Sequence, residues 1–486
     1  MKTPYLPKWA DRMIAGVPAL LVLLAVMLPS PKPANAIPAF ARKYGLPCSA
    51  CHITWPELTN FGQVFRDNGY QLMNERDSPI TRDASYFPAS IRITPQWHRE
   101  SANNQTIDVT PGTTEDGERK GTVTQAGFDL SGMDMWFAGT LFNNISFSVL
   151  PSSDSTATFH FENAYVRFDN IRGSRWFNLK VGKYELDLPV SEKREWTLSG
   201  NGGFYYIYHF IPANDTNIFG GIGDNQTGVE LTGHSANSYT RYAISAVSSL
   251  DGGVNLAYGC TAVNTNCSTP AGRTLDYYGH FEQAFNIGNG NLGYMKVGAY
   301  GYYGFAPTYW QTTGGTTQLY GLGNKPFYRA GAEWLWYTTH WNLKGVYLHG
   351  WDSLCLANVT ACNLGHVIPD TTGFQSTSWN GGFLEAEYVI SPQWVLLGRY
   401  ELIRMAQQGV VGAPGSLSNL DAYTFASRWN PFMFSRAGLA IQAEWSYIRS
   451  TDITNQGGAF GSTCFNPAAP CHIGSNSLFL ATDFAF

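Results

Sequence analysis

Charged residues are scarce in this chain of 486 residues. Asp, Glu, Lys and Arg together make up 14% of it, against about 25% in an ordinary soluble domain. This scarcity argues against a soluble enzyme, and the aromatic content of 15% with 51 glycines argues against a disordered or coiled-coil chain. The formal net charge of −5 argues against a nucleic-acid partner, because such partners are bound mainly through Lys and Arg.

Long apolar runs are nearly absent as well. The one such run, Met13–Leu28, is shorter than the roughly 20 residues that a membrane-spanning helix needs. A bundle of membrane helices is therefore excluded, and only a β-barrel could cross a bilayer. The run follows basic residues and precedes the small residues Ala34–Ala36, which predicts a secretory signal peptide over residues 1–36 rather than an anchor helix.

Two of the eight cysteines belong to a motif with a specific chemistry. Cys48 and Cys51 are followed directly by His52, which is the C-x-x-C-H pattern that attaches a c-type haem. The two thiols are spaced to add across the two vinyl groups, and the adjacent histidine then lies under the iron. In an exported chain this predicts one covalent haem c in a small helical cytochrome domain over residues 37–85, with a redox-active cysteine pair as the alternative.

A short helix is expected after this motif. Thr54–Glu57 has the pattern of a capping box, and Asn68–Gly69 has that of a helix stop. Between them, Leu58, Phe61 and Phe65 recur at helical spacing, which predicts one apolar stripe packed against the porphyrin. A domain of this size is too small both to bury a haem and to form its own hydrophobic core, so we expect it to pack against a larger part of the protein.

The sixth iron ligand is less well specified. Met73 is the only methionine between Ile37 and Tyr86, and a thioether ligand raises the reduction potential relative to a second imidazole. We therefore expect Met73 as the distal ligand. His98 is the alternative, because it falls on the inward side of the first strand.

The rest of the chain has a hydrophobic period of two. In the last segment Leu480 and Phe484 lie on one face and Ser477 and Asp483 on the other, which is the apolar-out, polar-in alternation of an outer-membrane strand. Such segments number about 16 and are joined alternately by short turns and long loops. They cover, approximately, residues 90–99, 126–140, 145–150, 158–169, 177–186, 227–234, 239–248, 275–286, 292–304, 327–338, 341–350, 378–390, 393–404, 419–430, 436–449 and 476–486. We predict an all-β fold, a transmembrane antiparallel β-barrel of about 16 strands over residues 86–486.

A barrel of this size normally leaves an aqueous channel that can admit a small domain, so the helical domain is expected to act as a plug. Polar side chains of the strands should then face the lumen as solvated pore lining. On the first strand these are Arg92, Thr94, Gln96 and His98, and further along the chain they are Glu385, Glu387, Arg399, Glu401 and Glu444.

The remaining six cysteines form three pairs with the same short gap, and all three fall in long loops on one side of the expected barrel. In an exported protein such spacing predicts local disulfides, and metal binding is the competing interpretation. The predicted pairs are Cys260 with Cys267, Cys355 with Cys362, and Cys464 with Cys471.

The N-terminal sequence resembles a known family. The run Ile37–Gly45 leading into Cys48–His52, with Glu57–Gly62 and Asn68–Tyr70 after it, is similar to the fused outer-membrane monohaem c-type cytochrome–porin of iron-oxidising bacteria. The similarity is sharpest over residues 37–72.

The resemblance implies a function in electron transport at the cell outer membrane. Cys48 and Cys51 would attach the haem and His52 would ligate it, on the periplasmic side or in the lumen. Such a protein would act as an iron oxidase, passing electrons from extracellular ferrous iron to a periplasmic cytochrome c or copper protein. The alternatives are a nutrient porin with a structural haem plug, and a cytochrome that exports electrons to extracellular acceptors.

Acidic residues of the outer loops could help to attract a ferrous cation to the outer mouth. They are Glu115, Asp116 and Glu118 of the first outer loop and Asp187, Glu192 and Glu195 of the third.

Overall fold

The computed structural model describes residues 39–53, 56–73, 88–108, 118–153, 158–191, 222, 225–248, 275–311, 318–352, 377–405, 420–433, 438–451 and 472–485. The expected signal peptide and the three expected disulfides lie outside these residues. Among the helices of the described part, none has the length and apolarity needed to cross a bilayer.

Among the described residues, three short helices precede the strands: α2 (Ala39–Tyr44), α3 (Cys48–Cys51) and α4 (Asn60–Asp67). The expected helix stop is confirmed, because α4 ends at Asp67 and Gly69 has a φ of 80°. The expected start is wrong. The side chain of Thr59 accepts a hydrogen bond from the Gly62 amide, so Thr59 caps α4 and the segment from Pro56 to Leu58 is a turn before it.

An aromatic cluster holds these helices together. The ring of Phe65 lies 5.0 Å from that of Phe40 and 5.4 Å from that of Tyr44, and Phe40 stacks on Tyr70 at 5.2 Å. Leu58 lies before α4, and of the predicted stripe only Phe65 enters this cluster, whereas Phe61 is 43% exposed.

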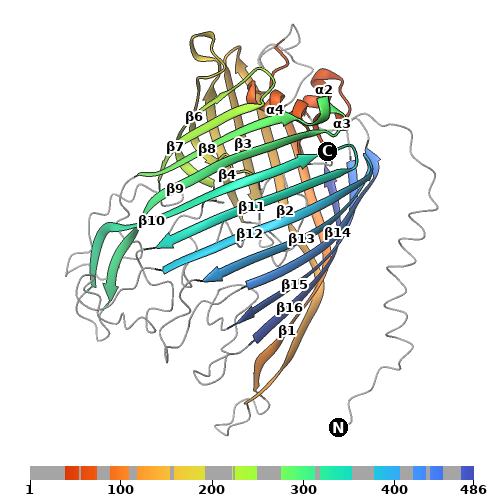
Figure 1. The fold of residues 1–486 in the computed structure, drawn as a ribbon. Helices are drawn as coiled ribbons and strands as arrows, with labels where there is room; N and C mark the ends of the chain where they lie inside the picture. The colour runs from red at the N-terminus through yellow and green to blue at the C-terminus, as the bar shows by residue number, and fades with distance from the viewer. Residues whose placement is uncertain are drawn as a thin grey trace. The chain divides into compact units, whose positions relative to one another are not determined.

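The described strands form one closed antiparallel barrel in which neighbours follow chain order and β1 pairs with β16 (Figure 1). Each of the 16 expected segments coincides with a strand, so the predicted strand number is confirmed. The strands are β1 (Ala89–Asp108), β2 (Glu118–Phe142), β3 (Ile145–Ser153), β4 (Phe159–Phe168), β5 (Asn178–Glu185), β6 (Asn225–His234), β7 (Thr240–Ser248), β8 (Leu275–Asn286), β9 (Tyr294–Gln311), β10 (Gln318–Tyr337), β11 (Trp341–Asp352), β12 (Thr377–Ser391), β13 (Trp394–Met405), β14 (Leu420–Met433), β15 (Gly438–Thr451) and β16 (His472–Ala485).

Large apolar side chains cover the outward face of the barrel. Phe128 is 90% exposed and Phe425 is 58% exposed, and Ile244 and Leu384 are exposed in the same way. A closed barrel bonds every strand to two neighbours, which is what a backbone needs in hydrocarbon, and an apolar outer face suits lipid. The fold is therefore a porin-like transmembrane barrel of the outer-membrane type.

The inward face is buried, and this corrects the expectation of solvated pore lining. Glu385, Glu387, Arg399, Glu401 and Glu444 face inward as expected, but each is at most 3% exposed. Burial of charge is tolerated when the charges are paired. Arg399 contacts Glu385 at 3.0 Å, and Lys344 contacts Glu385 and Glu387, so Glu385 and Glu387 are paired with cations of the wall.

Apolar side chains fill much of the remaining interior. Leu186, Leu188 and Val190, from the connection that follows β5, belong to one buried cluster. Its other members come mainly from inward positions of β7 to β15, among them Tyr278, Tyr300, Phe327, Val346, Trp379 and Phe383. The chain after β5 thus turns into the barrel and packs against its inner wall.

An arginine in the lipid-facing surface should be costly. Phe425 lies near the middle of β14, so Phe425→Arg should lower the free energy of unfolding by about 2–4 kcal/mol, and Asn476→Arg, on the outward face near one end of β16, by about 0–1 kcal/mol. Urea unfolding in lipid vesicles measures both. Equal losses would show that this face does not lie in lipid.

Candidate functional site

The Cys-x-x-Cys-His motif forms a single helical turn with its histidine directly after it. The amide of Ala50 donates to the Pro47 carbonyl at 3.0 Å, and the amide of His52 donates to the Cys48 carbonyl at 2.8 Å. The Cys48 side chain is buried, Cys51 is half-buried, and neither forms a disulfide. This turn presents both thiols and the imidazole from five consecutive residues.

The orientation of His52 suits iron coordination. Its Nδ1 lies 3.1 Å from the Pro56 carbonyl oxygen, and a nitrogen that donates to a carbonyl leaves Nε2 as the ligand. Burial lowers the pKa of His52 to about 4, against the opposing effect of the Pro56 and Glu57 backbone. The ring is therefore neutral near pH 7, which is the form that binds a metal.

The cysteine pair does not have the electrostatics of a redox-active dithiol. Burial and the neighbouring Cys48 raise the pKa of the Cys51 thiol to about 11. Redox-active Cys-x-x-Cys pairs depend on a lowered thiol pKa. The donor set of two thiols and one oriented imidazole fits a covalent haem c better than a redox pair.

The two candidates for the distal ligand lie apart from this turn. Met73 is 42% exposed, with a φ of 59°. His98 faces the lumen as expected, where its ring lies 5.4 Å from that of Phe479 and its Nδ1 lies 3.7 Å from Glu100 Oε1. No contact within the described part of the chain joins either side chain to His52, and the identity of the sixth ligand stays a prediction.

The helices contact the barrel at the end where the short turns lie. Gln71 Nε2 donates to the Asn143 carbonyl at 2.7 Å, and Asn60 Nδ2 donates to the Asn237 carbonyl at 3.3 Å. Both acceptors lie in short turns, one between β2 and β3 and the other between β6 and β7. These bonds fix the helical plug to one rim of the barrel.

The C-terminal end of α4 is held by an arginine of β4. Arg167 donates to the carbonyl of Arg66 at 2.8 Å and to that of Asp67 at 3.1 Å. The last carbonyls of a helix have no partner within it and carry its negative dipole end. Close approach also matters here, because a Cβ at Gly69 would lie 2.5 Å from Asp169 Oδ2.

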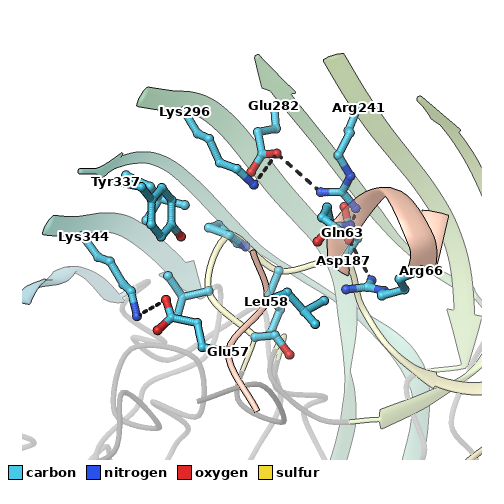
Figure 2. A pocket seen from close by; sticks show the side chains of 15 residues that line it. Glu57, Leu58, Gln63, Arg66, Asp187, Arg241, Glu282, Lys296, Tyr337 and Lys344 are labelled. Carbon is cyan, nitrogen blue, oxygen red and sulfur yellow. Dashed lines mark hydrogen bonds and ion pairs between the residues drawn. The ribbon is translucent and has the colours of Figure 1, made fainter. Parts of the chain in front are cut away.

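Four charged residues, which we call the docking cluster, join α4 to the lumen: Arg66, Asp67, Asp187 and Arg241. Asp67, Asp187 and Arg241 are buried, and Arg66 is partly exposed. Figure 2 shows Arg66, Asp187 and Arg241. Arg241 on β7 contacts Asp67 Oδ2 and Asp187 Oδ1, both at 2.9 Å. Arg66 reaches the same Asp187 Oδ1 at 3.2 Å. The cluster therefore links the plug, the wall and the connection after β5.

Asp187 corrects one expectation. It was expected in a solvated outer loop that attracts cations, yet it is buried in the docking cluster. Its Oδ2 also lies 3.2 Å from His280 Nδ1, and its carbonyl accepts from the Tyr278 hydroxyl at 2.7 Å. The reason is that its connection turns inward, where Arg66 and Arg241 supply the compensating charge. Glu118 begins β2, and the other four acidic residues lie outside the described part of the chain.

A second ion pair joins the plug to β11. Glu57 lies 2.8 Å from Lys344 Nζ, which also contacts Glu385 at 3.0 Å and Glu387 at 3.1 Å. Between this pair and the docking cluster lies a cavity of about 60 Å³, lined partly by Glu282, Lys296 and Tyr337 (Figure 2). Such a volume holds a few water molecules, not a nutrient-sized solute.

The cluster stabilises its carboxylates in the charged form. Burial alone would raise the pKa of Asp187, but Arg241, His280 and Arg66 together lower it well below its usual 3.8. Asp67 follows the same logic, since burial is outweighed by Arg241, His234 and Arg66 and its pKa is lowered. Both aspartates are therefore anionic across the neutral and mildly acidic range.

No protein-family model matches the chain, and no curated protein matches it. Among solved structures it is similar to an anion-selective porin from Comamonas acidovorans, at 10% identity over 82% of this chain and 99% of that chain, with a TM-score of 0.48. It is also similar to OmpF of Salmonella typhi in complex with daunomycin, at 9% identity over 82% and 94% of the chains and a TM-score of 0.43. OprB of Pseudomonas putida gives 10% identity over 82% and 94%, again with 0.43. These similarities concern the barrel fold, which the strand order above establishes independently.

Removing the central cation of the docking cluster should be strongly destabilising. Arg241→Met leaves three buried carboxylates, Asp67, Asp187 and Glu282, without it, which should lower the free energy of unfolding by about 3–5 kcal/mol. Arg404→Met is the matched control, because Arg404 pairs with Asp421 but is 40% exposed, and such pairs contribute about 0–1 kcal/mol. Urea unfolding in detergent compares the two, and a loss for Arg241→Met no larger than the control's would contradict the role of the cluster.

The ion pairs that hold α4 against the barrel wall should also persist in mild acid. Because the pKa values of Asp67 and Asp187 are lower in the folded protein than in the unfolded chain, their stabilising contribution is complete above the unfolded value of about 4 and is lost as the pH falls through the folded values. The melting temperature of Asp187→Asn should therefore approach that of the wild type below about pH 4. Asp421→Asn is the control for loss of a carboxylate outside the docking cluster. If the wild type already melts no higher than Asp187→Asn at pH 6, the stabilising role of the Asp187 carboxylate is refuted.

Proposed function

We propose that this protein spans the outer membrane and carries a covalent haem c in its N-terminal helices, through which electrons cross between the outside and the periplasm. The observation that carries the proposal is the Cys48–His52 turn, with Nδ1 of His52 held by the Pro56 carbonyl at 3.1 Å. When bound, haem c supplies a one-electron couple whose potential depends on its axial ligands and burial.

The residues of the plug have distinct roles in this proposal. Cys48 and Cys51 would form the two thioether bonds, and His52 would coordinate the iron through Nε2. The Pro56 carbonyl keeps the imidazole in the required tautomer. The docking cluster and the pair between Glu57 and Lys344 keep the whole turn at one end of the barrel.

The architecture supports transfer of electrons rather than of solutes. In the described part of the chain, paired charges and an apolar cluster occupy much of the inward face, and the cavity beside the plug holds only a few waters. An electron needs no open channel. A donor oxidised outside the cell would leave its product there, while the plug faces the side from which a carrier protein could approach.

Ferrous iron as the donor, and a periplasmic cytochrome c or copper protein as the acceptor, come from the resemblance over residues 37–72. Each ferrous ion would lose one electron and become ferric, and one acceptor would be reduced for each ion oxidised. A cytochrome that exports electrons would use the same parts in the opposite direction, with a lower haem potential.

The second candidate is a nutrient porin in which the haem plug is structural. The observation that favours it is the closed barrel of 16 strands, which is the architecture of outer-membrane porins. In this case the protein should conduct ions in a planar bilayer, and Arg241→Met should increase the conductance by loosening the plug.

The haem should be covalent and reducible by iron. A denaturing gel stained for haem peroxidase activity should show a band for the wild type and for Ser49→Ala, a control within the motif. The band should vanish when Cys48→Ala and Cys51→Ala are combined. The stain persisting in this double variant would contradict covalent attachment.

Stopped-flow mixing of the oxidised protein with ferrous salt, at acidic and near-neutral pH, then tests the function. Haem reduction should saturate with iron concentration. A haem that stays ferric at both pH values, with a potential too low to accept the electron, would leave the porin with a structural haem as the better account.

A further inference from the structure

We infer that Thr59 is the positioning residue of the haem-attachment turn, which it holds through a hydroxyl that both donates and accepts. The inference rests on the proposed haem function. Thr59 lies outside the Cys-x-x-Cys-His motif and touches neither cysteine side chain in any described contact. It acts instead on the backbone that carries them.

Four hydrogen bonds involve Thr59, and its carbonyl accepts one of them from the Gln63 amide at 2.9 Å. Its amide donates to the Cys51 carbonyl at 2.9 Å, and its hydroxyl donates to the Ala50 carbonyl at 2.9 Å. The same hydroxyl accepts from the Gly62 amide at 3.1 Å. One side chain therefore closes the end of α3 and the beginning of α4 together.

The haem-attachment turn needs such support because it is only one turn long. A helix of four residues cannot stabilise itself in water, since nucleation is unfavourable and few bonds repay it. The last carbonyls of any helix also lack partners within it. In α3 these include the carbonyls of Ala50 and Cys51, the two groups to which Thr59 donates.

A close backbone contact locks the same junction. A Cβ placed at Gly62 would lie 2.2 Å from the Cys51 carbonyl oxygen, so no other residue fits there without moving α4. A backbone bridge between His52 and Leu58 completes the junction. The direction of the His52 ring is thereby tied to α4, which is in turn fixed to the barrel by the docking cluster.

The consequence concerns the haem rather than the fold alone. The two thiols and the imidazole must meet the porphyrin in one geometry, and ligand orientation set by neighbouring hydrogen bonds influences metal affinity and potential. Loss of the donor function of Thr59 should therefore alter haem attachment and potential even when α4 remains capped.

Three substitutions separate these functions. Thr59→Ser keeps both the donor and the acceptor. Thr59→Asp keeps the acceptor and is an excellent N-cap, but its ionised carboxylate cannot donate to the Ala50 carbonyl. Thr59→Val keeps the shape and removes both. If Thr59 only caps α4, the Thr59→Asp variant should behave like Thr59→Ser. If Thr59 positions the turn, Thr59→Asp should behave like Thr59→Val.

Two measurements apply to each variant of the full-length protein. Hydrogen exchange of the His52 amide, made in the haemless background with Cys48→Ala and Cys51→Ala, should be about tenfold faster in Thr59→Asp and Thr59→Val than in Thr59→Ser, as expected for the loss of one hydrogen bond. In the haem-loaded protein, the ratio of haem to polypeptide should fall and the midpoint potential should shift in the same two variants.

The outcomes distinguish this inference from the proposed function. If the parent protein carries no covalent haem, the proposed function fails, yet the exchange series still tests the hold of Thr59 on the turn. If Thr59→Asp matches Thr59→Ser in exchange, haem content and potential, the inference is overturned while the haem function stands.

Discussion

The ion pairs that Arg241 makes with Asp67 and Asp187 connect the parts of this structure. Without them the helices would be held to the wall by Arg167, by the pair between Glu57 and Lys344 and by rim hydrogen bonds. Asp67 would lose its ion pair, and Asp187 would keep only Arg66 and His280 as partners. Buried pairs of this kind add little net stability compared with apolar packing, but each partner makes the others indispensable. The cluster therefore specifies where the plug sits more than it strengthens the fold.

The same constraint explains why the lumen differs from an open channel. Sixteen strands enclose room for water, and the polar inward residues would be solvated if the room were empty. Here Lys344 contacts three carboxylates, one of them from the plug. Leu186, Leu188 and Val190 belong to one cluster with aromatic rings of β8 to β12. In the described part of the chain these ion pairs and this cluster occupy the lumen where an open channel would hold water.

The barrel could be predicted from the sequence because the alternation of apolar and polar residues is local. The odd or even position of a residue, as for Leu480 and Asp483, gives the face of the strand on which it lies. The haem motif is local as well. Asp187 could not be placed, because its burial depends on Arg66 and Arg241, more than 50 residues away on either side. The start of α4 was also missed, because the Thr54–Glu57 pattern is local, whereas Thr59 caps α4 while its hydroxyl donates to the Ala50 carbonyl nine residues earlier. The inward parity of β7 and β11 could have indicated Arg241 and Lys344, but not their partners on the plug.

The position of the seam in the barrel has a consequence for assembly. The ring closes where β1 pairs with β16, whereas the plug is bound by Arg167 on β4, Arg241 on β7 and Lys344 on β11. These side chains belong to the part of the wall formed by consecutive hairpins, which can exist as a curved open sheet before the first and last strands meet. The helices can therefore settle onto this part of the wall before the first and last strands meet, and the final pairing of β1 with β16 then closes the barrel around them.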